Sequence, residues 1–120
     1  ILWRFFCGHF VVVECSLHVN YISHMLEVRQ TEVFAKWLAK LRDKEAKARI
    51  LLRIRRMTLG NPGDIKPVGQ GVSEMRVDYG PGYRIYVAMR NERLVILLCG
   101  GNKSRQQADI KTAWKLAKEI

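Results

Sequence analysis

The sequence predicts an α+β domain in which two N-terminal helices pack on a small antiparallel sheet and a third helix ends the chain. Apolar residues recur at helical spacing between residues 31 and 59, and again after residue 104. Between them, three β-type runs are joined by short links. A chain of 120 residues has room for one such domain and not for two.

The first 24 residues differ in composition from the rest. They contain one Arg, one Glu and no Lys, together with all three histidines and two of the three cysteines. A signal peptide would need an initiating Met, a basic start and a small-residue cleavage site, and only Arg4 resembles any of these. We therefore interpret residues 1–24 as a non-native or upstream-translated extension and residues 25–120 as the domain.

The two expected N-terminal helices follow a short strand at residues 26–29. Thr31 is a suitable N-cap for the first helix, whose core face is given by the spacing of Phe34, Trp37, Leu38 and Leu41. The second helix is expected from about residue 44 to residue 59, before the helix-breaking GNPG segment. Its buried residues are expected to be Ile50, Leu51, Ile54 and Met57.

The outward side of the second helix carries an arginine stripe: Arg42, Arg49, Arg53 and Arg56. Two interpretations stay open for this stripe. It is either a solvated helix face or an electrostatic docking surface.

Three strands are expected at residues 72–79, 83–90 and 94–99, after a loop that carries Lys66 and Pro67. Their short links predict antiparallel neighbours. A period of two places apolar residues on one face of the first two strands, and on the other Glu74, Arg76, Asp78, Arg84 and Tyr86. The run LVILLC does not alternate, so we expect either cover on both of its faces or a central place in the sheet, with helices over part of it. The pattern S-x-x-Q from Ser104 to Gln107 predicts a capping box at the start of the last helix.

The net charge of the chain limits the classes of binding partner to expect. Lys and Arg number 21 against 11 acids, a net charge of +10, which favours nucleic acid as a partner and an anionic membrane surface second. The longest apolar run is too short for a membrane-spanning helix. Cys99 is the only cysteine after residue 24 and ends an apolar run, as expected of a reduced cytoplasmic protein.

Residues 25–120 contain no histidine. This excludes serine triads, Cys/His pairs, zinc sites and a two-histidine ribonuclease mechanism within the domain. The carboxylates show no metal-site spacing, so we expect neither a metal nor another cofactor. A reaction here would depend on Arg, Lys and Tyr.

Two basic groups could bind a phosphate. Arg76 and Arg84 emerge on one face of a hairpin and could clamp it in bidentate fashion. The segment LLCGGNKSRQQ departs from the Walker A pattern, but a helix start with Lys103 and Arg105 suits a single phosphate; the alternative is a glycine turn with an ordinary cap.

Aromatic residues lie near the same hairpin. Tyr79, Tyr83 and Tyr86 could stack on unpaired bases, although alternation places Tyr79 in the core. A tyrosine hydroxyl held near cations that lower its pKa could also transfer a proton.

From Met25 onward, the sequence resembles the RelE/HigB superfamily of toxins, in the phage-derived branch called addiction module killer protein. The resemblance rests on FAKWLAKLRD, GDIKPVGQGVSEMRVDYGPGYRIY and LLCGGNKSRQQADI, in this order. It implies a RelE-like fold and a small endoribonuclease that cuts messenger RNA, in many relatives at the ribosome. It also implies a neighbouring antitoxin, of the helix-turn-helix type.

The resemblance assigns roles to individual residues. Arg76 matches the arginine of the motif E-[LM]-R, Arg84 matches that of G-Y-R, and Lys103 stands where relatives have a basic residue after the glycine pair. The C-terminal tyrosine of RelE-type relatives falls at Asp109, and the histidine of other branches is missing too. Tyr86, Lys66 and Lys103 are the candidates for the general base.

The sequence thus predicts a metal-independent mRNA interferase that acts by attack of a ribose 2′-hydroxyl. The expected catalytic residues are Arg76, Arg84, Lys103 and Tyr86, with Lys66, Tyr83 and Arg105 binding RNA. The alternative is a non-catalytic RNA-binding or inactive toxin-like module.

Overall fold

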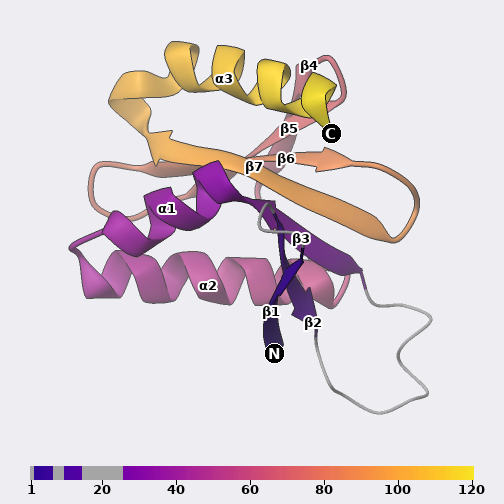
Figure 1. The fold of residues 1–120 in the computed structure, drawn as a ribbon. Helices are drawn as coiled ribbons and strands as arrows, with labels where there is room; N and C mark the ends of the chain where they lie inside the picture. Colours follow the sequence, from indigo (N-terminus) through magenta and orange to yellow (C-terminus); the bar gives the residue numbers. More distant parts are fainter. Residues whose placement is uncertain (1, 7–9, 15–25) are drawn as a thin grey trace.

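The computed structural model describes residues 2–6, 10–14 and 26–120 (Figure 1). Its strands are β1 (Leu2–Phe6), β2 (Phe10–Glu14), β3 (Glu27–Thr31), β4 (Ile65–Gly69), β5 (Val72–Val77), β6 (Tyr83–Met89) and β7 (Leu94–Asn102). Its α-helices are α1 (Glu32–Lys40), α2 (Lys44–Thr58) and α3 (Gln106–Glu119), and a 3₁₀ turn at Lys103–Arg105 precedes α3.

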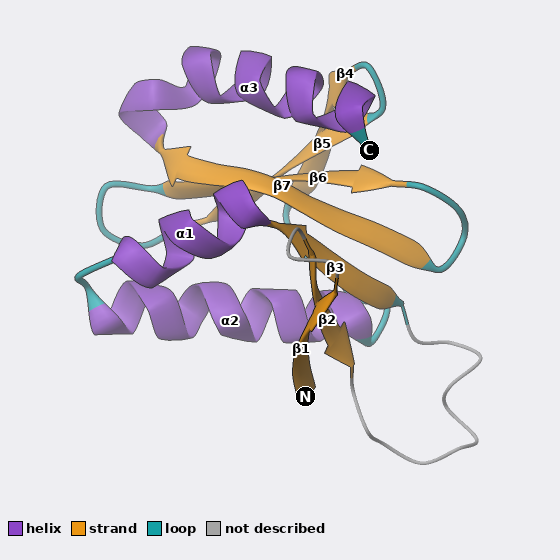
Figure 2. Ribbon diagram, in the orientation of Figure 1, coloured by secondary structure: helices purple, strands orange, loops and turns teal. Residues whose placement is uncertain are grey.

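The elements form three layers, with one sheet between helices (Figure 2). The strand order is β1-β2-β3-β7-β6-β5-β4, and α3 lies on the face opposite α1 and α2. The α+β class and the three helices are therefore as predicted.

The prediction of an antiparallel sheet is wrong at one junction, because β3 pairs with β7 in parallel. Short links determine the direction of β5, β6 and β7 only, whereas more than sixty residues separate β3 from β7 along the chain. The expected loop around Lys66 and Pro67 is also wrong, since these residues lie in β4, which pairs with β5. As an edge strand, β4 can hold a proline, which lacks a backbone donor.

The helix starts differ in how well the sequence predicts them. Thr31 caps α1 as expected, with its Oγ1 accepting from the backbone N–H of Phe34 at 3.1 Å. The capping box at Ser104 is wrong, because Asn102 Oδ1 accepts from the Ser104 N–H at 3.1 Å and caps the 3₁₀ turn. The Ser104 hydroxyl also donates to Asn102, so it does not cap α3.

The face under α1 and α2 is apolar. Phe34, Leu38, Ile50, Ile54 and Met57 are buried there as predicted, with Trp37, Leu41 and Leu51 partly buried at the margin. They pack on the alternating side chains of the sheet: Met75, Val77, Ile85 and Val87. Alternation along the hairpin therefore predicts this face correctly.

Two arginines of the stripe on α2 make contacts within the domain. The Arg53 guanidinium donates to the carbonyls of Pro62, at 2.9 Å, and Arg76. Arg49 pairs with Glu45 at 3.1 Å and lies over the Tyr79 ring, 4.6 Å from its centre. These contacts fasten α2 to the β5–β6 hairpin, so the stripe is not simply a solvated face.

The backbone of the first 24 residues is described in part. β2 pairs antiparallel with β3, with Phe10 opposite Thr31 and Val13 opposite Val28. Residues 1, 7–9 and 15–25, which include all three histidines and the change of composition at Met25, lie outside the described residues. The interpretation of residues 1–24 as an extension stays a prediction.

Candidate functional site

The candidate site lies on the sheet face that α3 covers. Two neighbouring rows of cross-strand partners define it. The first row runs Lys66, Glu74, Tyr86 and Cys99 across β4, β5, β6 and β7. The second row runs Arg76, Arg84 and Gly101 across β5, β6 and β7.

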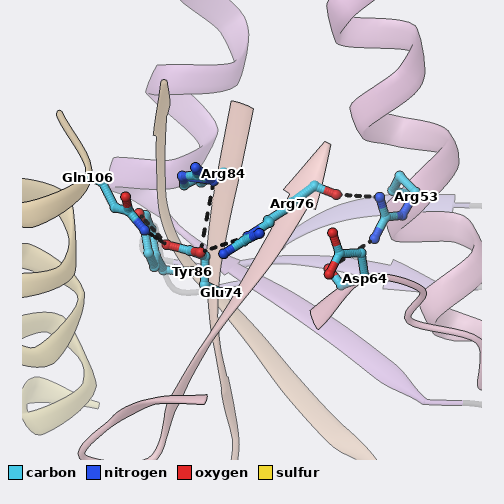
Figure 3. A network of polar contacts seen from close by, with 7 residues as sticks. All are labelled: Arg53, Asp64, Glu74, Arg76, Arg84, Tyr86 and Gln106. Carbon is cyan, nitrogen blue, oxygen red and sulfur yellow. Dashed lines mark hydrogen bonds and ion pairs between the residues drawn. The ribbon is translucent and has the colours of Figure 1, made fainter. Parts of the chain in front are cut away.

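Glu74 is at the centre of these rows and is fully buried (Figure 3). Its Oε2 accepts from Gln106 Nε2 at 2.8 Å and from the Tyr86 hydroxyl at 3.1 Å. Its Oε1 accepts from Arg76 Nε at 3.3 Å and lies 3.9 Å from Arg84 Nη1. The carboxylate thus collects donors from β5, β6 and α3.

These partners keep Glu74 ionised. Burial alone would raise the pKa of the Glu74 carboxyl, but donation from Gln106, Arg76 and Tyr86 outweighs it. The charge of Arg84 acts in the same direction, so the pKa lies below its ordinary value. The basic face therefore contains an anion of its own.

The two arginines differ in exposure. Arg84 is buried, with 8% of its surface exposed, whereas the Arg76 side chain is 38% exposed. Arg84 Nε has no hydrogen-bond partner among the described residues. A buried donor without a partner carries a desolvation cost, so this position suits an incoming anionic oxygen.

The Tyr86 phenol holds its proton firmly. Burial, followed by the charge of Glu74, raises its pKa well above the ordinary value. Tyr86 does not meet the condition of a pKa lowered by nearby cations, because the carboxylate that accepts from the hydroxyl outweighs Arg84. In this environment Tyr86 is a donor and a poor proton acceptor.

Close packing on both faces explains the glycine pair before Lys103. A Cβ on Gly100 would lie 2.5 Å from the Trp37 ring on the α1 side. A Cβ on Gly101 would lie 1.9 Å from Asp109 Oδ2 on the α3 side. The pair therefore admits an aromatic ring on one face and a carboxylate on the other.

Asp109, in the first turn of α3, is the second carboxylate of this face. Its Oδ2 is buried and has no hydrogen-bond partner among the described residues. Its Oδ1 lies 4.0 Å from Nε of Arg105, whose side chain is 71% exposed. Burial raises the pKa of the Asp109 carboxyl, and Arg105 only partly offsets this.

The structure brings Arg76, Arg84 and Tyr86 together around Glu74, and the other predicted site residues lie outside this cluster. Lys103 and Arg105 are exposed just after β7, where the Lys103 N–H donates to the Gly82 carbonyl at 2.8 Å. Lys66 is exposed on the edge strand. Tyr83 lies elsewhere, because its ring packs against Trp37 on the α1 side, with 6.3 Å between ring centres.

Sequence reasoning missed three residues of the site: Glu74 as its centre, Gln106 and Asp109. For Glu74 a signal was available, because it alternates in phase with Arg76, Arg84 and Tyr86. Gln106 and Asp109 depend on how α3 crosses the sheet, which no local pattern specifies. No group of three or more potential metal ligands was found among the described His, Cys, Asp and Glu residues.

Comparison with known proteins identifies the family. Residues 36–119 match the model of the family described as Phage derived protein Gp49-like (DUF891), so the chain belongs to this family, which is one of addiction-module killer toxins. An uncharacterized protein of Haemophilus influenzae is 50% identical over 95 residues, covering 79% of this chain and 96% of that protein. No solved structure matches. No helix in the described part of the chain is both long and apolar enough to cross a membrane.

Proposed function

We propose that the protein is the toxin of a type II toxin–antitoxin pair and acts as a RelE-like endoribonuclease on messenger RNA, in association with the ribosome. The observation that carries this proposal is the pair Arg76 and Arg84, opposite each other on adjacent strands. The Arg76 side chain is 38% exposed, and Arg84 has a buried donor without a partner in the described part of the chain. Family membership supplies the toxin context.

The chemistry follows from the charge of this pair. The guanidinium groups of Arg76 and Arg84 exceed the Glu74 carboxylate by one positive charge, and Arg105 offsets the charge of Asp109. Additional negative charge develops on the phosphate when a 2′-hydroxyl attacks it, and fixed donors favour that state over the ground state. Lys103 and Arg105 are exposed nearby and would bind the RNA backbone, with Lys66 at the other edge.

One observation favours the alternative of a non-catalytic RNA-binding or inactive toxin-like module. Glu74 already accepts from Arg76 and Tyr86, so part of the donor capacity of the site is used internally. An inactive module would bind RNA without cutting it. Enzyme and binder therefore differ in whether new RNA ends appear.

Replacement of Arg76 by Ala tests the proposal. We expect the soluble variant to lose growth arrest on expression, since loss of one transition-state donor costs on the order of 3 kcal/mol, or about 100-fold in rate. Arg42→Ala removes an exposed arginine from the link between α1 and α2 and serves as the control for charge. Unchanged toxicity of a folded Arg76→Ala protein would contradict the assignment.

An antitoxin is the expected partner, which we propose to be a helix-turn-helix protein encoded beside the toxin. It would either cover the Arg76 and Arg84 face or bind exposed arginines of the stripe, such as Arg42 just before α2 and Arg56 within it. Co-expression of the neighbouring gene should abolish growth arrest and yield a complex with salt-sensitive association. Continued arrest with no complex would argue against that gene product.

A further inference from the structure

Asp109 lies at the β7 end of the arginine row. The row runs Arg76, Arg84 and Gly101, and the Asp109 carboxylate occupies the space that a side chain at position 101 would fill. Gln106, one helical turn earlier, faces the same sheet surface and donates to Glu74. The first turn of α3 therefore directs a carboxylate toward the row that would bind the phosphate.

The contacts of Asp109 differ from those of Glu74 and Asp43. Glu74 accepts from Gln106 and Tyr86 as well as Arg76, and Asp43 caps α2. Asp109, in contrast, has one oxygen that is buried without a partner among the described residues and another 4.0 Å from Nε of the exposed Arg105. An acceptor without a donor in a buried position costs free energy, which suggests that a ligand supplies the donor.

A ribose 2′-hydroxyl is a donor of the required kind. The cleavage reaction needs a group that removes its proton, and Tyr86 does not suit this role because its own proton is held by Glu74. We propose that Asp109 is the general base that takes the proton of the attacking 2′-hydroxyl, an inference that rests on the proposed function. Asp109 is then a catalytic residue that contacts the substrate.

The step balances without a cofactor. The 2′-hydroxyl proton moves to the Asp109 carboxylate, the 2′-oxygen forms a bond to phosphorus, and the bond from phosphorus to the 5′-oxygen breaks. The leaving 5′-oxygen takes a proton from water, and the hydroxide that remains takes the proton from Asp109 and restores the carboxylate. The products are a 2′,3′-cyclic phosphate and a 5′-hydroxyl. Arg76 and Arg84 neutralise the charge that develops on the phosphate.

Arg105 would couple substrate binding to the basicity of Asp109. Arg105 lies 4.0 Å from the carboxylate, and its exposed side chain is free to turn toward a bound phosphate. Its charge partly offsets the effect of burial on the pKa of Asp109, so its departure would raise that pKa further. The base would then strengthen when the substrate is in place.

The direct test is the substitution Asp109→Asn in the whole chain. Cleavage is measured on a synthetic RNA or, where cleavage needs the ribosome, on programmed ribosomes. We expect cleavage to fall about 100-fold or more while RNA binding persists, since general-base catalysis contributes at least this much. The rate of the natural protein should rise with pH as Asp109 loses its proton, with a midpoint above the ordinary Asp value, and this rise should disappear in the variant. Asp78→Asn, an exposed change of the same kind in the hairpin, is the matched control.

Gly101→Ala tests the same inference with Asp109 intact. The added Cβ would displace the end of the Asp109 side chain, and Gly101 is not among the positions with positive φ, so we expect a folded protein that cleaves slowly. If Asp109→Asn does not fold, Gly101→Ala decides: a slow rate supports the inference and a normal rate overturns it.

Cleavage by folded Asp109→Asn within about threefold of the natural rate would also overturn the inference, since a general base contributes at least about 100-fold. Absence of cleavage by the natural protein would instead refute the proposed nuclease.

Discussion

The two faces of the sheet are buried by different means. On the α1 and α2 side, the buried residues are apolar, and Phe34, Ile50 and Met75 are typical of them. On the α3 side, an apolar cluster around Leu98 and Ile110 is joined by a fully buried carboxylate and a nearly buried guanidinium, those of Glu74 and Arg84. Burial of the first face requires only side chains that are apolar and fit together. Burial of the second also requires hydrogen-bond donors and opposite charges at particular positions.

This difference separates stability from the proposed function. Apolar burial is non-directional and stabilises the fold wherever the side chains fit. Buried charges contribute to stability only weakly when paired, and they cost much when a partner is lost. The buried charges of the face under α3 are the reason why we propose for it a role beyond stability, as a site that receives an anion.

The largest expected effect is that of removing the buried carboxylate. Glu74→Ala should lower the free energy of unfolding by about 3–5 kcal/mol, because Arg84 would be left buried without its counter-charge. Glu45→Ala breaks an exposed pair with Arg49 and should cost below about 1 kcal/mol. Urea unfolding of both variants measures the difference, and equal losses would contradict the distinction between buried and exposed pairs.

The same carboxylate has a pH signature in the natural protein. Because its pKa is lowered in the folded state, Glu74 contributes stability above the ordinary Glu pKa. That contribution should be lost as the pH falls from the ordinary value through the lowered one. Glu74→Gln should flatten this part of the unfolding free energy curve, and an unchanged acid slope would show that the carboxylate is not held by its donors.

A smaller contrast is expected between the two glycines. Gly100→Ala places a methyl group against the Trp37 ring, which is confined by Phe34 and Tyr83, and should cost about 1–3 kcal/mol. Gly101→Ala meets only the end of a carboxylate side chain, so its cost should be smaller. Thermal unfolding of the two variants compares the faces directly, and a greater loss for Gly101→Ala would reverse the comparison.

Local patterns predict the apolar face well. Helical spacing identifies Phe34 and Ile54, alternation identifies Met75 and Ile85, and a threonine before a helix identifies its cap. These features depend on neighbours within a few residues or on burial of any suitable kind. They can therefore be predicted from the sequence alone.

The other face depends on contacts between distant segments. Alternation places Glu74, Arg84 and Tyr86 opposite the apolar side correctly, but the cover supplied by α3 converts that side from exposed to buried. The parallel pairing of β3 with β7 is equally non-local. The capping-box prediction at Ser104 fails for a local reason. The Asn102 side chain, two residues earlier, accepts the hydrogen bond from the Ser104 N–H.

Mapping of messenger RNA 5′ ends tests the central claim most directly. Cells would express the natural protein or a folded Arg76→Ala variant at equal levels, with 5′ ends mapped before and after induction. We predict new 5′ ends at defined codon positions with the natural protein and their near-complete loss with the variant. Growth arrest by the natural protein without new RNA ends would contradict the claim that this face cleaves RNA.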